Sequence, residues 1–217
     1  MAPDKPAEQR PELADFWDLR FRSGMTPWET QRVPTALREF VARHPAFAPA
    51  DPADVTSRSL PCRRRVLIPG CGSAHDATFL DTLGWETIAL DFSAAAIATA
   101  RSTLGDGWRG QLLCADFFTF DPGKAFDVIY ERAFLCSMPR QLRTNYAKRM
   151  AELLPPGGLL VGFFLFGDEL RGPPFEILPQ QLEDLLSAHF SRREDHSVDD
   201  SLALFAGRER WQVWQRL

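Results

Sequence analysis

No stretch of this sequence approaches the run of about 20 apolar residues that a membrane-spanning helix requires. The first 12 residues are polar and contain proline, so they lack the apolar core of a signal peptide. From these two features we expect a cytoplasmic protein that has no membrane partner.

Cysteine is scarce. The four cysteines form no CxxC pair, and they show no metal-like spacing with the four histidines. We therefore expect reduced, mostly buried thiols and no metal site. The cysteines are Cys62, Cys71, Cys114 and Cys136.

An excess of positive charge is also missing. The chain has 25 Lys and Arg against 29 Asp and Glu, and its formal net charge is −4. Because phosphate contacts require clustered Lys and Arg, this balance argues against a nucleic-acid partner. Residues 63–65 are consecutive arginines, which we interpret as the solvated start of a strand. A small molecule is the expected partner; the oligomeric state is open, with a monomer favoured.

Apolar strands alternate with helical patterns in the middle of the chain. Strands are predicted at 65–68, 85–90, 111–114, 126–130 and 159–166, and helices at 75–83, 93–103 and 139–154. Ser93 is the expected N-cap of the second helix. This alternation predicts an α/β fold around a mostly parallel sheet.

The C-terminal part follows a different pattern. Residues 179–190 read as a helix, and residues 194–198 and 209–215 alternate as strands do. Two late strands joined by a short loop predict an antiparallel hairpin at the sheet edge, which brings the sheet to seven strands.

A glycine turn points to a nucleotide-type cofactor. Gly70 and Gly72 follow the first predicted strand, where glycine permits positive φ and close approach of a ligand. The next helix would offer unpaired N–H groups to a carboxylate or phosphate. Asp91 ends the second strand, where a carboxylate can accept both hydroxyls of a ribose. Other candidates in the segments that follow these two strands are Cys71, Phe92 and Ser93.

The type of cofactor depends on the third position of the turn. A dinucleotide fingerprint would have glycine where this chain has His75. S-adenosylmethionine has no pyrophosphate and does not need that glycine. Asp116 and Phe117 follow the third strand, where an acid can accept the adenine amine and a ring can line the base. A nicotinamide-dependent oxidoreductase and a non-catalytic cofactor-binding protein stay open as alternatives.

Several motifs resemble the thiopurine S-methyltransferase family, including its thiol and halide methyltransferase branch. The motifs lie at residues 16–21 (FWDLRF), 24–29 (GMTPWE), 69–72 (PGCG), 126–132 (FDVIYER) and 172–175 (GPPF). The resemblance implies a Rossmann-like class I methyltransferase that uses S-adenosylmethionine. It further implies one methyltransferase domain over residues 1–217. In that domain, residues 1–60 form a helical extension that caps the cofactor site, residues 63–166 form the cofactor-binding core, and residues 167–217 form the substrate side.

The resemblance also implies specific contacts. The aromatic residues Trp17, Phe21 and Trp28 would close over the cofactor, and Phe21 replaces the tryptophan usual in the family. Further implied cofactor contacts are Gly70, Asp91, Asp116, Phe117 and Arg132.

An apolar, aromatic acceptor pocket is expected beside the cofactor. Its candidate lining residues are Trp28, Phe134, Cys136, Phe164, Phe166 and Phe175. Arg132 is the one catalytic candidate, since a guanidinium can hold an anionic nucleophile; a surface ion pair with Glu131 is its alternative. We expect methyl transfer to a small thiol or thione sulfur, with a heterocyclic nitrogen or a halide as alternative acceptors.

Overall fold

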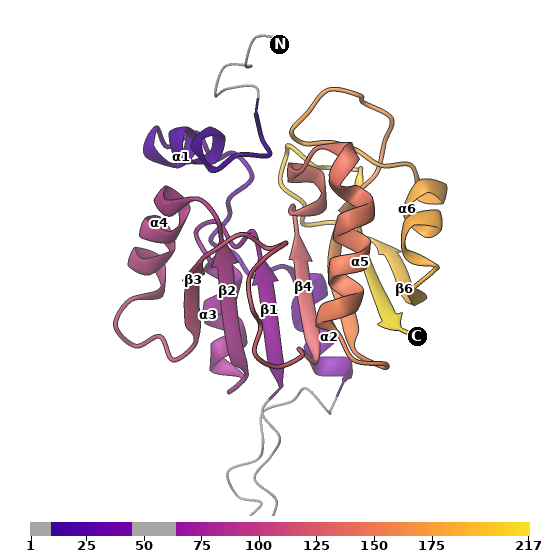
Figure 1. The fold of residues 1–217 in the computed structure, drawn as a ribbon, viewed down its shortest axis with the longest axis horizontal. Helices are drawn as coiled ribbons and strands as arrows, with labels where there is room; N and C mark the ends of the chain where they lie inside the picture. The colour runs from indigo at the N-terminus through magenta and orange to yellow at the C-terminus, as the bar shows by residue number, and fades with distance from the viewer. Residues whose placement is uncertain (1–9, 45–63) are drawn as a thin grey trace, which may run out of the picture.

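The computed structural model describes residues 10–44 and 64–217. Seven strands form one sheet in the order β3-β2-β1-β4-β5-β7-β6 (Figure 1). The strands are β1 Arg65–Pro69, β2 Glu86–Asp91, β3 Gln111–Cys114, β4 Val128–Arg132, β5 Leu159–Leu165, β6 Phe190–Ser197 and β7 Glu209–Arg216. The first five pair in parallel, whereas β7 runs antiparallel to both β5 and β6. The predicted seven-stranded α/β sheet is confirmed.

The parallel strands are buried on both faces of the sheet. In β1, Val66 and Ile68 pack into one apolar core and Leu67 into the other, because successive side chains of a strand point to opposite faces. Helices α2 (Thr35–Arg43), α3 (His75–Thr82) and α4 (Ala94–Leu104) pack into the first core. Helices α5 (Arg143–Leu153) and α6 (Pro179–Leu186) pack into the second (Figure 1). No helix of the described ranges has the length and apolar character needed to cross a bilayer.

Local signals determine where α4 begins. The Ser93 hydroxyl accepts the Ala96 N–H at 3.1 Å, which confirms the predicted N-cap.

The largest differences from the predictions lie in the C-terminal half of the chain. The helix predicted at 139–154 is a 3₁₀ turn at Arg140–Leu142 followed by α5. The predicted helix 179–190 ends at Leu186, because Phe190 instead begins β6 and buries its ring in the core. Residues 198–208 join the two late strands, so their connection is longer than the expected short loop.

Helix α1 (Ala14–Arg22) lies above the carboxyl ends of the parallel strands (Figure 1). Its Asp18 carboxylate accepts the Ser93 hydroxyl at 2.6 Å and the Ala95 N–H at 3.0 Å. These bonds fasten α1 to the start of α4. The N-terminal segment is thereby held at the sheet edge where ligands of open α/β folds bind.

Candidate functional site

A cavity of about 620 Å³ opens at the carboxyl ends of β1, β2 and β4. Residues of α1 and of the segments just before and after it also line this cavity. Eleven of the predicted cofactor residues line it: Trp17, Phe21, Trp28, Gly70, Cys71, Gly72, Asp91, Phe92, Asp116, Phe117 and Arg132. Ser93 is not among the lining residues, since its side chain caps α4. The structure therefore brings together residues that lie more than a hundred positions apart in the sequence.

Both glycines of the turn need their lack of a side chain. Gly70 and Gly72 have φ values of +58° and +52°. A Cβ atom at Gly70 would overlap the Phe134 ring, and one at Gly72 would overlap the Glu29 carboxylate. The predicted positive φ is confirmed. The groups found close to the two glycines are side chains of the protein, so close approach of a ligand stays a prediction.

The backbone N–H groups of residues 71–74 are all bonded within the protein. Their acceptors, in order, are the Leu90 carbonyl (3.0 Å), the Asp91 carboxylate (3.1 Å), the Glu29 carboxylate (3.1 Å) and the Cys71 carbonyl (2.8 Å). These four donors are therefore used within the protein. The unpaired N–H groups were expected from the helix that follows, α3, which begins at His75, and that expectation stays a prediction. The carboxylates of Glu29 and Asp91 accept two of these donors, and backbone carbonyls accept the other two.

Asp91 is a buried carboxylate at the end of β2. It accepts the Gly72 N–H at 3.1 Å and the Ser93 N–H at 2.8 Å. Burial raises its pKa to about 6, although these two hydrogen bonds favour the charged form. At neutral pH the group is an ionised acceptor in the cavity wall.

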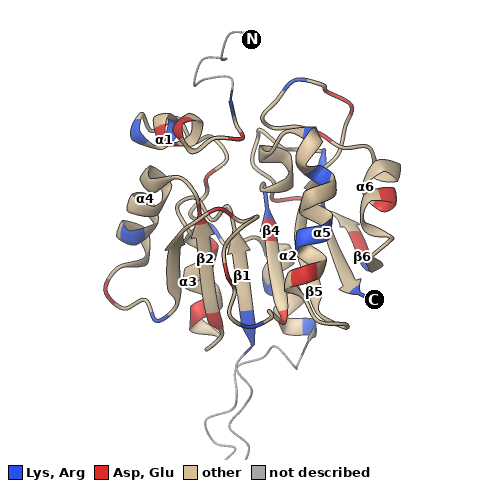
Figure 2. Ribbon diagram, viewed as in Figure 1, with Lys and Arg blue, Asp and Glu red and all other residues tan. Residues whose placement is uncertain are grey.

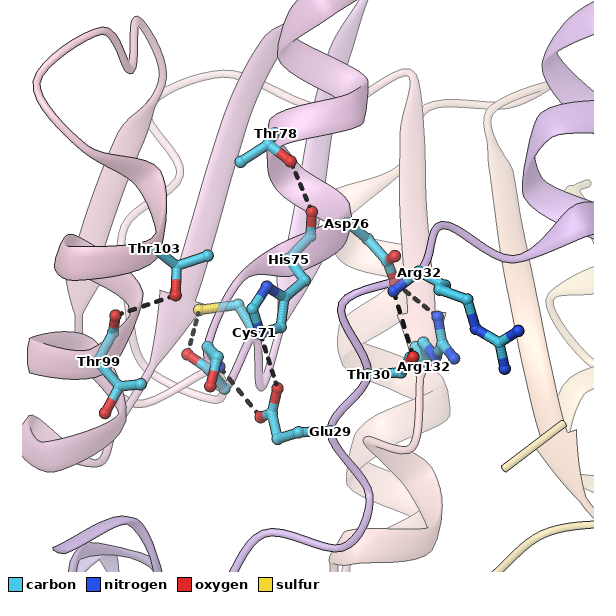
Figure 3. A network of polar contacts seen from close by, with 12 residues as sticks. Glu29, Thr30, Arg32, Cys71, His75, Asp76, Thr78, Thr99, Thr103 and Arg132 are labelled. Carbon is cyan, nitrogen blue, oxygen red and sulfur yellow. Dashed lines mark hydrogen bonds and ion pairs between the residues drawn. The ribbon is translucent and has the colours of Figure 1, made fainter. Parts of the chain in front are cut away.

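Arg132 pairs with Asp76 of α3 rather than with its neighbour Glu131. Its Nη1 lies 3.0 Å from Asp76 Oδ2 (Figure 3). The same oxygen also accepts the Tyr130 hydroxyl at 2.9 Å. Burial alone would lower the pKa of Arg132, but Tyr130 and Asp76 raise it. The guanidinium is thus a fixed cation in the cavity wall.

Glu131 is fully buried at the end of β4, next to Arg132. Figure 2 shows charged residues of both signs at the upper end of this strand. Its carboxylate accepts the Phe134 N–H at 2.8 Å, the Leu135 N–H at 3.1 Å and the Tyr146 hydroxyl at 2.7 Å. These bonds hold the turn that places the Phe134 ring against Gly70. Burial raises the pKa of Glu131 to about 7.

We expect Glu131→Gln to change the pH dependence of stability. A folded-state pKa above the unfolded value means that this group favours folding most below pH 4.5 and loses that contribution as pH rises through 7. The loss corresponds to roughly 3 kcal/mol in the free energy of unfolding. Urea unfolding should show the variant gaining stability relative to wild type between pH 5 and pH 8. The exposed Glu152→Gln is the control, and parallel pH profiles for wild type and Glu131→Gln would contradict the assignment.

Three aromatic rings of the extension lie together over the cavity. The Trp28 ring centroid is 5.5 Å from that of Trp17 and 6.2 Å from that of Phe21, both in edge-to-face geometry. Trp28 also packs against the apolar cluster of Cys136, Leu165 and Phe205. It therefore connects the extension to the C-terminal part of the cavity.

The predicted acceptor residues divide into two groups. Phe134 and Cys136 line the large cavity, along with Trp28 and Arg132. Phe164 and Phe175 instead border a separate void of about 10 Å³, and Phe166 packs against the core beneath α5 and α6. Pro173 and Pro174 of the GPPF motif line the cavity themselves, in place of Phe175.

Sequence reasoning missed several lining residues, namely Glu29, His75, Asp76, Leu204 and Phe205. Glu29 had a signal, since it closes the 24–29 motif. Asp76 reads as an ordinary acid in the first turn of a helix, where the macrodipole favours it. Leu204 and Phe205 lie in the connection 198–208, which carries no recognisable pattern.

The lining fits S-adenosylmethionine. The cavity has the volume of a small-molecule site. It offers an ionised acid at the end of β2, a buried Phe117 ring and a cover of aromatic rings. Among the residues that the structure describes, no group of three or more His, Cys, Asp or Glu is placed to hold a metal ion.

Known proteins resemble the chain over its whole length. Residues 13–216 match the thiopurine S-methyltransferase (TPMT) family. Thiocyanate methyltransferase 1 of Brassica oleracea is 28% identical to this chain. The match covers 99% of this chain and 92% of the relative's length. Probable thiol methyltransferase 2 of Arabidopsis thaliana is 32% identical. This match covers 78% of the chain and 70% of the relative's length.

A solved structure shares the fold. It is the Burkholderia thailandensis 1,6-didemethyltoxoflavin-N1-methyltransferase with bound 1,6-didemethyltoxoflavin and S-adenosylhomocysteine. It has a TM-score of 0.71 and 16% identity, and covers 100% of this chain and 92% of that chain. The family match decides between the enzyme classes left open by the glycine turn. The chain belongs to the thiopurine S-methyltransferase family and is an S-adenosylmethionine-dependent methyltransferase.

Proposed function

We propose that the enzyme transfers the methyl group to the sulfur of a small thiol or heterocyclic thione. The observation that carries this proposal is the apolar wall formed by Trp28, Phe134 and Pro173-Pro174, with Arg132 as a cation beside it. Such a wall suits a soft, polarisable nucleophile, and the guanidinium can attract a thiolate. The relatives named for thiocyanate and thiol methyltransfer support the same acceptor class.

The chain's residues would hold the cofactor at the carboxyl edge of the sheet. We propose that Asp91 accepts the ribose hydroxyls, that Phe117 lines the adenine and that Asp116 accepts its amine. When bound, S-adenosylmethionine supplies an activated methyl group on a sulfonium. The protein orients the acceptor and excludes water. Because thiols ionise near neutral pH, the acceptor needs no strong general base.

The aromatic rings of the extension are proposed to cap this site. We expect Trp28→Ala to raise the cofactor dissociation constant several-fold, since a ring that packs on both Trp17 and the C-terminal cluster is lost. Calorimetry with S-adenosylhomocysteine measures the change. Leu19→Ala removes an exposed apolar side chain from α1 and should bind like wild type. Wild-type affinity in folded Trp28→Ala would exclude a capping role.

A methyl-transfer screen tests the proposed acceptor class. The purified enzyme is incubated with S-adenosylmethionine and a set of thiols, thiopurines, iodide and N-heterocycles, and S-adenosylhomocysteine is quantified. We expect the highest kcat/KM among the sulfur compounds. Preference for a nitrogen heterocycle or for iodide would reject sulfur as the acceptor, and no turnover above background with any compound would reject the enzyme activity.

We further propose a cytoplasmic enzyme that acts on free small molecules as a monomer, without a nucleic-acid partner. The three cysteines within the described ranges, Cys71, Cys114 and Cys136, are free thiols, which suits a reducing compartment. Cys62 lies outside the described residues.

A further inference from the structure

The connection between the last two strands reaches the side of the cavity that lies away from the proposed nucleoside contacts. Those contacts follow β2 and β3, at one end of the strand order, whereas β7 lies beyond β5 (Figure 1). Because β7 runs antiparallel to β5, Glu209 at its start lies opposite Leu165 at the carboxyl end of β5. Residues 198–208 lead into that point, and Phe205 among them lines the cavity. This connection therefore borders the space left for the methyl acceptor.

Phe205 is a buried ring in this wall. It shares an apolar cluster with Cys136 and Leu165, against which Trp28 also packs. Since Trp28 and Cys136 line the cavity as well, the Phe205 ring fills the space between the cavity and the end of β5. A shorter side chain at this position would extend the cavity toward Leu165.

Hydrogen bonds fix the turn that carries the ring. The Phe205 N–H donates to the Leu202 carbonyl at 2.8 Å, and the Phe205 carbonyl accepts the Arg208 N–H at 3.0 Å. The Arg208 guanidinium also donates to the Leu204 carbonyl at 2.6 Å and pairs with the buried carboxylate of Glu176. Because the backbone is bonded on both sides of the ring, Phe205 is a fixed part of the wall.

The start of the connection is fastened as well. The Asp200 carboxylate accepts the Thr35 N–H at 2.8 Å, at the beginning of α2. The Ser201 hydroxyl donates to the Glu209 carboxylate at 2.7 Å. The connection is thus held by α2 and by β7, which keeps its wall in place when an acceptor enters.

We propose that Phe205 is a specificity-determining residue that limits the size of the methyl acceptor. The inference rests on the proposed transfer to sulfur. A single cavity of about 620 Å³ has to hold both the cofactor and the acceptor, so the depth of its wall near β5 decides which acceptors fit. With the ring in place, the site favours thiols with one ring or an aliphatic chain over thiols with two fused rings.

Two acceptors that differ by one fused ring test this role, benzenethiol and 2-naphthalenethiol. The value of kcat/KM is measured for each by the S-adenosylhomocysteine that the full-length enzyme forms. We expect wild type to prefer benzenethiol at least tenfold, and Phe205→Leu to reduce that preference at least tenfold. Phe205→Trp should increase the preference, since a larger ring shortens the pocket. The ratio of two acceptors in one variant does not depend on its folded fraction or on its affinity for the cofactor.

Phe190→Leu is the matched control, because Phe190 is also a buried ring of the C-terminal part but does not line the cavity. It should keep the wild-type preference, and calorimetry should show that all three variants bind S-adenosylhomocysteine within about twofold of wild type. An unchanged preference in Phe205→Leu and Phe205→Trp, with benzenethiol still methylated, would overturn the role of Phe205 and leave the proposed function standing. A wild-type enzyme that methylates neither thiol would overturn both.

Discussion

Asp91→Ala is expected to weaken S-adenosylmethionine binding at least tenfold. The substitution removes a buried carboxylate that lines the cavity at the end of β2, and with it the proposed acceptor of two ribose hydroxyls. Hydrogen bonds to a charged group contribute about 1.5–3 kcal/mol each, so even one lost bond corresponds to about a tenfold change. Isothermal calorimetry of the folded variant measures the effect.

Asp121→Ala is the matched control for this loss. Asp121 also accepts a backbone N–H two residues onward, at Gly123, but it lies outside the cavity lining. It should bind the cofactor like wild type. Unchanged affinity in folded Asp91→Ala would remove Asp91 from the ribose site.

The raised pKa of Asp91 adds a pH signature to the same assignment. If only the ionised carboxylate accepts the ribose, the dissociation constant of wild type should rise about tenfold per unit as pH falls below 6. This pH dependence of the dissociation constant should be absent from the Asp91→Ala variant. A wild-type affinity that is flat between pH 5 and 7 would contradict it.

Gly70→Ala is expected to abolish most of the activity while the chain still folds. The added methyl group would overlap the Phe134 ring, which packs edge-to-face on Phe117 at a centroid distance of 5.0 Å. Displacing Phe134 therefore disturbs both the acceptor wall and the proposed adenine contact. Because misplacement by about 1 Å can cost roughly 100-fold in rate, we expect a loss of that order in kcat/KM.

Gly84→Ala separates backbone strain from this steric effect. Gly84 also has positive φ (+77°), but no atom lies within 4 Å of an added Cβ. Both variants should lose about 1–2 kcal/mol of stability from the left-handed backbone, and Gly70→Ala should lose more because of the overlap with Phe134. Gly84→Ala should keep wild-type kcat/KM. Equal kinetics in the two variants would show that Phe134 does not shape the site.

The sequence was sufficient to predict features that depend on neighbouring residues. Alternation of strands and helices predicted the sheet, Ser93 the start of α4, and Gly70 and Gly72 the positive φ of the turn. Each depends on a short segment whose residue types restrict the backbone directly. The boundary between α6 and β6 was misplaced because Phe190 fits the apolar pattern of either element.

Contacts between distant segments were not predictable in the same way. Glu29 bonds the turn at Ser73, 44 positions away, and Asp76 pairs with Arg132, 56 positions away. No local pattern relates such partners, because their approach depends on how the segment after α1, the glycine turn, α3 and β4 assemble. For the same reason, Arg132 could be interpreted as a surface partner of Glu131 until the packing of both residues was known.

The central claim is that this enzyme methylates sulfur. It is tested most directly by one acceptor that offers both kinds of atom, a heterocyclic thione with ring nitrogens. The enzyme is given S-adenosylmethionine labelled with ¹³C in its methyl group, and the product is identified by NMR, where S-methyl and N-methyl carbons resonate separately. We predict a single S-methyl product together with stoichiometric S-adenosylhomocysteine, whereas an N-methyl product, or none, would contradict the claim.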